Sequence, residues 1–352
     1  MAYTAVRGGE QAIVAAERLE RADAGERLSP AQLVAALPYA VDTVIAEAGL
    51  YAPELAALAL AQARGDLPEA AFLLRAYRST LPRVHQTPAL DTGTVRVVRR
   101  ISSTYKDVPG GQVLGATRDY TRRLLGSELA DAEVAPDMEL GAAPEHDGGG
   151  LPKVTDLLRE SGLVSAPAAT EEAEPYDITR HALRVPPPRS GRLQGLARGE
   201  AGALTALAYS SLRGYGATHP TLAEFRVGHL PVLVEHPHAG VAVEIGEIVC
   251  TEVETVQHDH GGGDQLELGY GFTLGRNERK AIAMAILDAA IEAGNARAEG
   301  PAAPAEDEEF VLFHVDGIEA TGYVEHLKLP HYVSFQSSLD RLRAHTDQEE
   351  DR

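Results

Sequence analysis

The chain has 352 residues, and its 32 Lys and Arg residues against 52 Asp and Glu residues give a net charge of −20 with neutral histidines. A hydrophobic fraction of 44% and a charged fraction of 24% support a buried core and exclude wholesale disorder. The length allows two or three domains of roughly 100 to 200 residues, and the negative charge disfavours non-specific binding to nucleic acid or to an anionic membrane, since both polyanions repel it.

The cysteine content and the lack of a long apolar run define the expected compartment. Cys250 is the only cysteine, so the chain forms no intrachain disulfide and holds no iron-sulfur cluster on its own cysteines. The N-terminus contains no apolar signal core, and the most apolar run, residues 55–63, is far shorter than the roughly 20 residues of a bilayer span. We therefore expect a cytoplasmic protein with no membrane partner.

Helix start signals dominate the N-terminal region, residues 1–130. Ser29 and Gln32 have the spacing of a capping box, in which each side chain satisfies the other residue's backbone amide. Asp66 has the same capping spacing before a second helix. Pro38 is expected to divide one helical segment into two. This region is therefore predicted to be mainly helical.

A strand and an acidic linker are expected next. Apolar and basic residues alternate over 94–101, which predicts a short strand. Residues 131–178 are rich in Ala, Pro, Gly and acids, and we interpret them as a linker around one short helix near 156–160. An acidic tail, residues 346–352, ends the chain.

The region 179–345 mixes strands and helices. The expected strands cover 226–236, 241–256, 266–274 and 310–315, and the expected helices cover 199–212 and 278–292, the second of them capped by Asn277. Helical segments come first and strands later, and this order predicts an α+β fold in place of a doubly wound sheet.

The first candidate site is a pair of arginine-rich islands. Residues 96–123 contain seven basic residues and two acidic ones, a local charge of +5, and residues 178–199 contain five arginines and no acid. Cationic side chains suit phosphate oxygens, and glycines let backbone amides join such a site. The candidate phosphate ligands are Arg99, Arg100, Lys106, Gly110 and Gly111. The alternative is that these arginines pair with the surplus carboxylates of this chain or of a partner subunit.

The second candidate is a glycine-flanked tyrosine after an apolar helix. Gly214, Tyr215 and Gly216 suit a loop in which backbone approaches a nucleotide and a ring stacks on its base, with Arg213 and His219 nearby. The run matches neither the phosphate-binding loop nor the dinucleotide fingerprint. Glycine beside tyrosine is also common in ordinary turns.

The third candidate is a histidine pair. On a regular helix the five-residue step from His326 to His331 rotates by about 140° and separates the rings, but Pro330 breaks that geometry. A turn there could direct both imidazoles toward one metal ion, although two histidines fill only half of the four positions usual for zinc. The alternative is a solvated pair in a loop.

Several long segments together resemble the PhnI family, a subunit of the bacterial carbon-phosphorus lyase core complex that works in phosphonate utilisation. They are TAVRGGEQA near the N-terminus, AAFLLRAY (70–77), RRISSTYKDVPGGQVLG (99–115), ALAYSSLRGYGATHP (206–220), ERKAIAMA (278–285) and DEEFVLFHVDGIEATGYVEHLKLPHYVSFQ (307–336). The resemblance covers nearly the whole chain and fades over 130–177 and 257–265.

This resemblance implies assembly with the PhnG, PhnH and PhnJ subunits. With PhnL, such a subunit takes part in replacing the adenine of ATP by methylphosphonate, which gives alpha-D-ribose 1-methylphosphonate 5-triphosphate, and alone it is associated with nucleosidase activity on ATP and GTP. Radical cleavage of the C–P bond belongs to PhnJ and its iron-sulfur cluster. His326 and His331 match a pair of zinc ligands near the interface with PhnJ.

The implied reaction passes through an oxocarbenium-like state, so it needs an anionic group beside the sugar and an acid for the departing base. Asp107, Glu247 and His219 could supply these groups, and the sequence does not choose among them. The rival interpretation is a non-catalytic scaffold that docks the radical-enzyme subunit and supplies metal ligands. A nucleotide hydrolase unrelated to phosphonates is a third.

Overall fold

A computed structural model describes residues 9–23, 25, 28–120, 151–164, 174–213, 220–258 and 264–350. The predicted linker 131–178 therefore lies mostly outside the described residues, apart from its short helix. That helix, α6 (Val154–Glu160), is where the sequence placed it.

Helices α2 to α5 form the N-terminal body. The capping box is confirmed: the Gln32 amide donates to Ser29 Oγ over 3.3 Å, and the Ser29 amide donates to Gln32 Oε1 over 2.8 Å. Pro38 begins a new helix, as predicted, and the Glu69 amide donates to Asp66 Oδ1 over 3.1 Å. The bounds are α2 Pro30–Ala36, α3 Pro38–Ala48, α4 Pro53–Gln62 and α5 Leu67–Thr80. Buried Val44, Ile45, Leu60 and Leu74 form the centre of this body.

An antiparallel sheet in the order β1-β2-β3-β4 forms the middle of the molecule among the described residues. Its strands are β1 Arg96–Ile101, β2 Thr221–Glu235, β3 Ala242–His258 and β4 Leu266–Leu274. These strands lie where the sequence predicts them, and the α+β class is confirmed. Because β1 pairs with β2, the regions 1–130 and 179–345 share one sheet.

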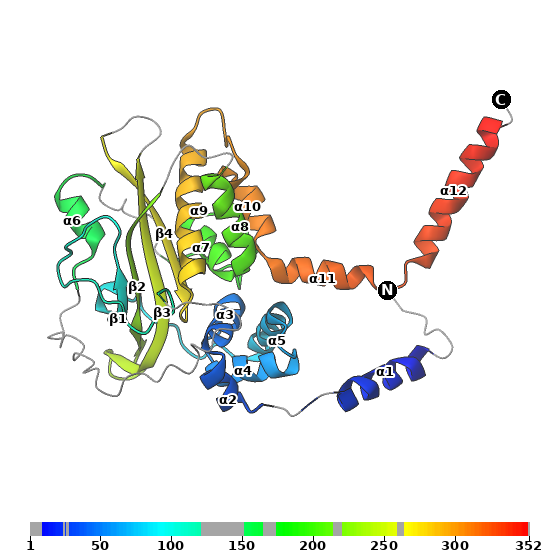
Figure 1. The fold of residues 1–352 in the computed structure, drawn as a ribbon, viewed down its shortest axis with the longest axis horizontal. Helices are drawn as coiled ribbons and strands as arrows, with labels where there is room; N and C mark the ends of the chain where they lie inside the picture. Colours follow the sequence, from blue (N-terminus) through cyan, green and yellow to red (C-terminus); the bar gives the residue numbers. More distant parts are fainter. Residues whose placement is uncertain are drawn as a thin grey trace.

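Helices cover both faces of the sheet (Figure 1). Helix α9 (Glu278–Ala296) lies against one face, with α7 (Arg189–Arg198), α8 (Ala201–Leu212) and α10 (Glu308–His314) beyond it. Helix α6 lies on the other face, where Val154 and Leu158 pack on the sheet. Among the described residues, a 3-10 turn, Thr92–Thr94, precedes β1, and another, Pro304–Glu306, lies between α9 and α10.

One local prediction is wrong, and another holds only in part. Residues 310–315 do not form a strand, because Asp307 Oδ1 accepts the Phe310 amide over 3.0 Å and begins α10, which then buries Val311. Asn277 occupies the N-cap position of α9, as predicted, but its side chain makes no capping hydrogen bond. Its Nδ2 instead donates to the backbone oxygens of Asp42 and Leu274, so it ties the N-terminal body to the sheet.

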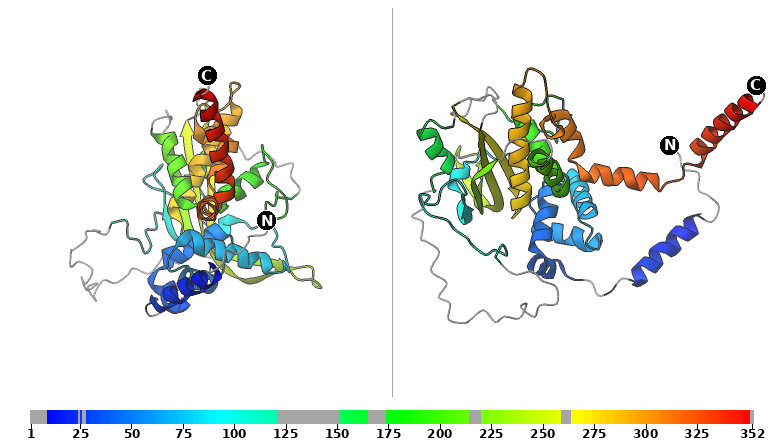
Figure 2. Two further views of the ribbon diagram at one scale, coloured as in Figure 1. Left: turned by 90° about the vertical axis from the view of Figure 1, so that its right-hand side faces the viewer. Right: turned by 45° about the horizontal axis from the view of Figure 1, so that its top comes forward.

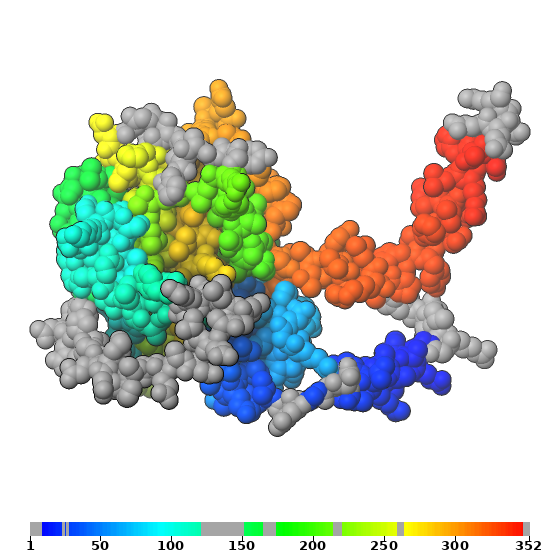
Figure 3. All heavy atoms as spheres, viewed as in Figure 1, coloured from blue at the N-terminus to red at the C-terminus, as the bar shows by residue number. Residues whose placement is uncertain are grey.

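Three helices project from this core as arms: α1 (Gly9–Asp23), α11 (Gly317–Leu327) and α12 (Tyr332–Glu350). Figures 2 and 3 show α11 and α12 extending away from the sheet and its covering helices. Among the described residues no single helix is long and apolar enough to cross a membrane, and the pair α3 and α4 passes such a test only jointly, with a 99° bend.

Glycines in β4 allow α9 to lie directly on the sheet. A Cβ at Gly269 would lie 2.0 Å from the Ala285 carbonyl oxygen, and a Cβ at Gly271 would lie 2.1 Å from that of Ala281. Both contacts are to backbone, so no side-chain rotation relieves them.

Gly269→Ala is therefore expected to lower the free energy of unfolding by about 1 to 3 kcal/mol, since the added methyl group pushes α9 off the sheet. Urea denaturation of the variant measures this loss. The control is Gly322→Ala in α11, where a Cβ meets nothing within 4 Å, and which should be neutral or stabilising by up to about 1 kcal/mol. Equal effects would show that α9 adapts freely.

Candidate functional site

The histidine pair converges at the corner between two arm helices. His326 lies in the last turn of α11, and His331 directly precedes α12. Their Nε2 atoms are 3.3 Å apart, and the rings are perpendicular with centroids 5.0 Å apart. His331 Nδ1 lies 2.6 Å from the Leu329 carbonyl oxygen. That oxygen can only accept, so Nδ1 carries the proton and Nε2 of His331 offers its lone pair.

This geometry fits two ligands of one tetrahedral metal ion. Zinc–nitrogen bonds of about 2.0 to 2.1 Å at a tetrahedral angle place two ligand nitrogens about 3.3 to 3.4 Å apart, which matches the observed 3.3 Å. The backbone oxygen that orients His331 is a usual second partner for a metal-binding imidazole. The described residues hold no cluster of three or more His, Cys, Asp or Glu suited to a metal.

Arg100 is engaged inside the protein. Its side chain is fully buried, and its Nε donates to Glu224 Oε1. Its Nη groups donate to the backbone oxygens of Pro109, over 2.5 Å, and Pro152, over 2.9 Å. Arg100 therefore makes the carboxylate pair that the alternative interpretation predicts, and its phosphate-binding role stays a prediction.

Arg99 is similarly occupied. Its Nε lies 2.7 Å from Glu278 Oε1, an Nη group pairs with Asp119, and another donates to the Leu114 carbonyl oxygen over 2.7 Å. The side chain is 6% exposed. Any bound phosphate would have to compete with two carboxylates already in place.

The loop beside these arginines has a polar exposed surface. Lys106, Asp107, Gly110 and Gly111 are all exposed, and both glycines have positive φ, at 81° and 74°. The φ of 81° favours glycine at position 110, where a Cβ would also lie 2.2 Å from Leu151 Cδ2. The structure thus brings the predicted glycines next to Arg100 and leaves Lys106 as the predicted phosphate ligand open to solvent.

Glu247, a candidate anion beside the sugar, is exposed on β3. Arg96 Nη2 donates to Glu247 Oε2 over 2.8 Å, and His229 Nδ1 lies 3.6 Å from the same oxygen. The hydrogen bond from Arg96 lowers the pKa of the Glu247 carboxyl group. Glu247 is therefore suited to the anionic role and unsuited to that of a general acid near neutral pH.

The glycine-flanked tyrosine loop lies largely outside the described residues. Arg213 is exposed at the end of α8, where its Nη1 donates to the Tyr209 hydroxyl group over 2.7 Å. Gly214, Tyr215, Gly216 and His219 are not among the described residues, so their roles stay predictions.

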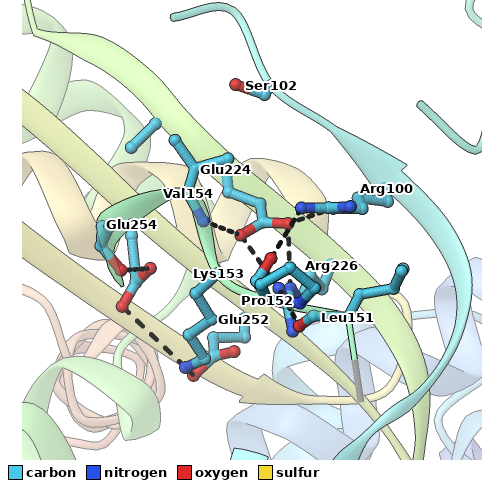
Figure 4. Close-up of polar contacts among 12 residues, drawn as sticks. Arg100, Ser102, Leu151, Pro152, Lys153, Val154, Glu224, Arg226, Glu252 and Glu254 are labelled. Atoms are coloured by element: carbon cyan, nitrogen blue, oxygen red, sulfur yellow. Dashed lines mark hydrogen bonds and ion pairs between the residues drawn. The ribbon is translucent and has the colours of Figure 1, made fainter. Parts of the chain in front are cut away.

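Sequence reasoning missed a set of buried and half-buried charged side chains on the α6 face of the sheet (Figure 4). We call this set the sheet-face cluster: Arg100, Lys153, Glu224, Arg226, Glu252 and Glu254. The signal was the spacing, since residues 224 and 226, and residues 252 and 254, are two apart in strands and so share a face.

The sheet-face cluster fastens one chain segment to the sheet. Lys153 Nζ lies 2.7 Å from Glu252 Oε1, and the Val154 amide donates to Glu224 Oε2 over 3.0 Å. Thr155 Oγ1 donates to Glu254 Oε2 over 2.7 Å. Burial, as the largest cause, raises the pKa of Glu254, partly offset by Lys153. Every carboxylate of the cluster has a cationic or hydrogen-bonding partner, whereas Nε and Nη1 of Arg226 are buried without a hydrogen-bond acceptor among the described residues.

A second missed group anchors helix α11. We call α11, α12 and the histidine pair between them the histidine arm. Arg75 Nη1 donates to both carboxylate oxygens of Asp316 over 3.0 and 2.9 Å, its Nε donates to the Glu47 carbonyl oxygen, and its Nη2 donates to that of Arg198. Asp316 is the N-cap of α11. Both residues lie within the segments of family resemblance, 70–77 and 307–336, which was the available signal.

Comparisons with known proteins place the whole chain in one family. The family model for the bacterial phosphonate metabolism protein (PhnI) matches residues 2–349. A Stutzerimonas stutzeri protein named as a C-P lyase subunit protein, HtxH, is 47% identical over 364 residues, which cover 99% of this chain and 96% of that protein. Alpha-D-ribose 1-methylphosphonate 5-triphosphate synthase subunits PhnI are 47% identical in Rhizobium meliloti (strain 1021), covering 97% and 94%, and in Escherichia coli (strain K12), covering 97% of each chain.

Proposed function

The chain belongs to the PhnI family of bacterial phosphonate metabolism proteins, and on that premise we propose its role within the carbon-phosphorus lyase pathway. It acts in phosphonate utilisation as one subunit of a multi-subunit complex. With PhnG, PhnH and PhnL it displaces the adenine of ATP by methylphosphonate, and alone it releases adenine from ATP or GTP. The 47% identity to named synthase subunits over 97% of the chain carries this proposal.

The displacement sets clear demands on the protein. A phosphonate oxygen forms a bond to the anomeric carbon while the bond from that carbon to the adenine nitrogen breaks, and the departing base takes up a proton. The oxocarbenium-like stage needs a nearby anion, for which the exposed carboxylate of Glu247 is suited, and the hydrogen bond from Arg96 lowers its pKa further. The exposed Lys106 and Arg213 are available for the triphosphate, and His219 remains a candidate acid.

The histidine arm is proposed to hold zinc together with PhnJ. The 3.3 Å separation of the two Nε2 atoms supports this site, and the partner would supply the remaining ligands. When bound, zinc would supply a Lewis-acid centre that also ties the two subunits together. Exposed apolar side chains beside the pair give the partner a surface to cover: Tyr323, Val324, Leu327, Tyr332, Val333 and Phe335.

A scaffold role is the second candidate. It is supported by the ion pairs that both arginines already make. Arg99 pairs with Asp119 and Glu278, and Arg100 pairs with Glu224. In that case the chain would dock partners and contribute histidines without binding ATP itself.

The test supplies ATP and methylphosphonate to the pure chain, then to the chain with PhnG, PhnH and PhnL, and follows the sugar products by phosphorus NMR. The chain alone leaves the anomeric carbon open to water, so it should give ribose 5-triphosphate, whereas the assembled proteins should exclude water and give the methylphosphonate product. Glu247→Gln should slow adenine release by about 100-fold.

The matched control is Glu299→Gln, which removes another exposed carboxylate and should leave the rate unchanged. If the pure chain releases no adenine and Glu247→Gln changes neither rate nor product in the full mixture, the scaffold role replaces the catalytic one.

A further inference from the structure

Strands β2 and β3 run beyond the rest of the sheet as a two-stranded ribbon. Strand β1 pairs with β2 only as far as His229, and β4 pairs with β3 only from Cys250. From the pair Leu230 and Ile248 to the pair Glu235 and Ala242, β2 and β3 pair only with each other among the described residues. We call residues 230–248 the ribbon, and Figure 2 shows it projecting past the rest of the sheet.

The ribbon exposes apolar side chains. Val241 directly precedes β3, Val243 and Ile245 lie in it, and the three are 56%, 42% and 67% exposed. Ile245 lies at a bulge opposite Val232 and Leu233. A two-stranded ribbon with uncovered β-branched side chains is marginally stable and prone to pair with other chains. We therefore expect a binding partner to cover these apolar side chains.

Local hydrogen bonds order the hairpin turn at the tip of the ribbon. The His236 amide donates to the Val241 carbonyl oxygen over 2.9 Å and closes the hairpin. His236 Nδ1 accepts the amides of His238, over 3.2 Å, and Ala239, over 3.1 Å. A preformed edge loses less conformational entropy when a partner binds.

Only one edge of the ribbon is open to a new strand. Pro231 has no amide proton, and a proline within a ladder is tolerated where its nitrogen faces away from the paired strand, so it blunts the outer edge of β2. Residues 241–248 of β3 contain no proline. The Gly275 amide donates to the Val249 carbonyl oxygen over 2.7 Å, and from Ile248 back to Ala242 the outer edge of β3 pairs with no strand among the described residues.

The charges of the ribbon select its partner. Residues 229–248 contain no Lys or Arg, and their charged side chains are Glu235, Glu244 and Glu247. Glu247 pairs with Arg96, whereas Glu235 and Glu244 have no cationic partner in the part of the chain that the structure describes. A second copy of this chain would bring the same acidic side chains together, which is destabilising across strands. The complementary partner is apolar and basic.

We propose that the outer edge of β3 in the ribbon receives a β-strand from a different protein subunit. Apolar side chains of that strand cover Val241, Val243 and Ile245, and its Lys or Arg side chains face Glu235 and Glu244. The inference rests on the proposed function in one respect, namely that the subunit belongs to the same complex.

The test coexpresses the chain with PhnG, PhnH and PhnJ and isolates the complex. The double variant Val243→Lys, Ile245→Lys should weaken assembly by at least tenfold, because buried ammonium groups would replace apolar contacts. The charge reversal Glu235→Lys, Glu244→Lys should weaken it in a salt-dependent way. The control Val98→Lys changes a valine that is 39% exposed in β1 and should assemble like the wild type.

Hydrogen exchange gives a second readout that does not depend on activity. Amides of residues 242–247 should exchange at least tenfold more slowly in the wild-type complex than in the isolated chain. Normal assembly of both ribbon variants without this protection would overturn the ribbon proposal and leave the proposed function intact. A wild-type chain that assembles with none of these subunits would overturn both. Dimers of the pure chain that the double lysine variant dissociates would assign the edge to a second copy and overturn the hetero-subunit proposal.

Discussion

Glu224→Gln is expected to lower the free energy of unfolding by about 3 to 5 kcal/mol, the usual cost of leaving a buried charge without its partner. Glu224 is 2% exposed and lies between Arg100, fully buried, and Arg226, 2% exposed. The amide of glutamine keeps the shape and loses the negative charge, so two guanidinium groups would stay in the interior with less compensation. Urea denaturation followed by circular dichroism measures the change.

The control for this prediction is Asp156→Asn. Asp156 pairs with Arg159 over 2.8 Å at the surface, where its side chain is 53% exposed, so its loss should cost no more than about 1 kcal/mol. A loss below about 1 kcal/mol for Glu224→Gln as well would contradict the structural role of the sheet-face cluster. That result would favour Arg100 as a phosphate ligand, and ATP titration of the Arg100→Met variant would test this role directly.

Local signals account for the parts of the fold that could be predicted. The capping box of Ser29 and Gln32 and the break at Pro38 involve residues close in sequence, and both are present as expected. The wrong prediction of a strand at 310–315 also came from a local signal. Its apolar and aromatic residues favour a strand, and the Asp307 cap together with burial of Val311 outweighed that preference.

Long-range pairing explains what the sequence could not predict. Arg100 and Glu224 are 124 residues apart, and Arg75 and Asp316 are 241 apart. Composition correctly suggested that the arginines could meet surplus carboxylates. Only the strand register decides which ones they meet. The convergence of His326 and His331 could be predicted because they are only five positions apart and Pro330 between them breaks the helix.

Replacing His326 or His331 by Ala is expected to remove zinc from the assembled complex while subunit assembly persists. Each change deletes one of the two Nε2 ligands that lie 3.3 Å apart. Since loss of even a supporting contact to a metal ligand costs about 10- to 100-fold in affinity, loss of a ligand itself should cost about 100-fold or more. Elemental analysis of the dialysed complex measures the metal, and size-exclusion chromatography measures assembly.

Both histidines are exposed, so folding should be insensitive to their loss. The matched control is His345→Ala, an exposed histidine farther along α12, which should retain zinc at the wild-type level. The isolated wild-type chain should bind zinc weakly, because it supplies only two of the four positions. Asp316→Asn separates the ligands from their support: it weakens the Arg75 pair at the base of α11 and keeps both imidazoles. Zinc retention in the His326→Ala, His331→Ala double variant would disprove the metal assignment. If the Asp316→Asn variant also loses zinc, the position of the whole arm is required for the site in addition to the two rings.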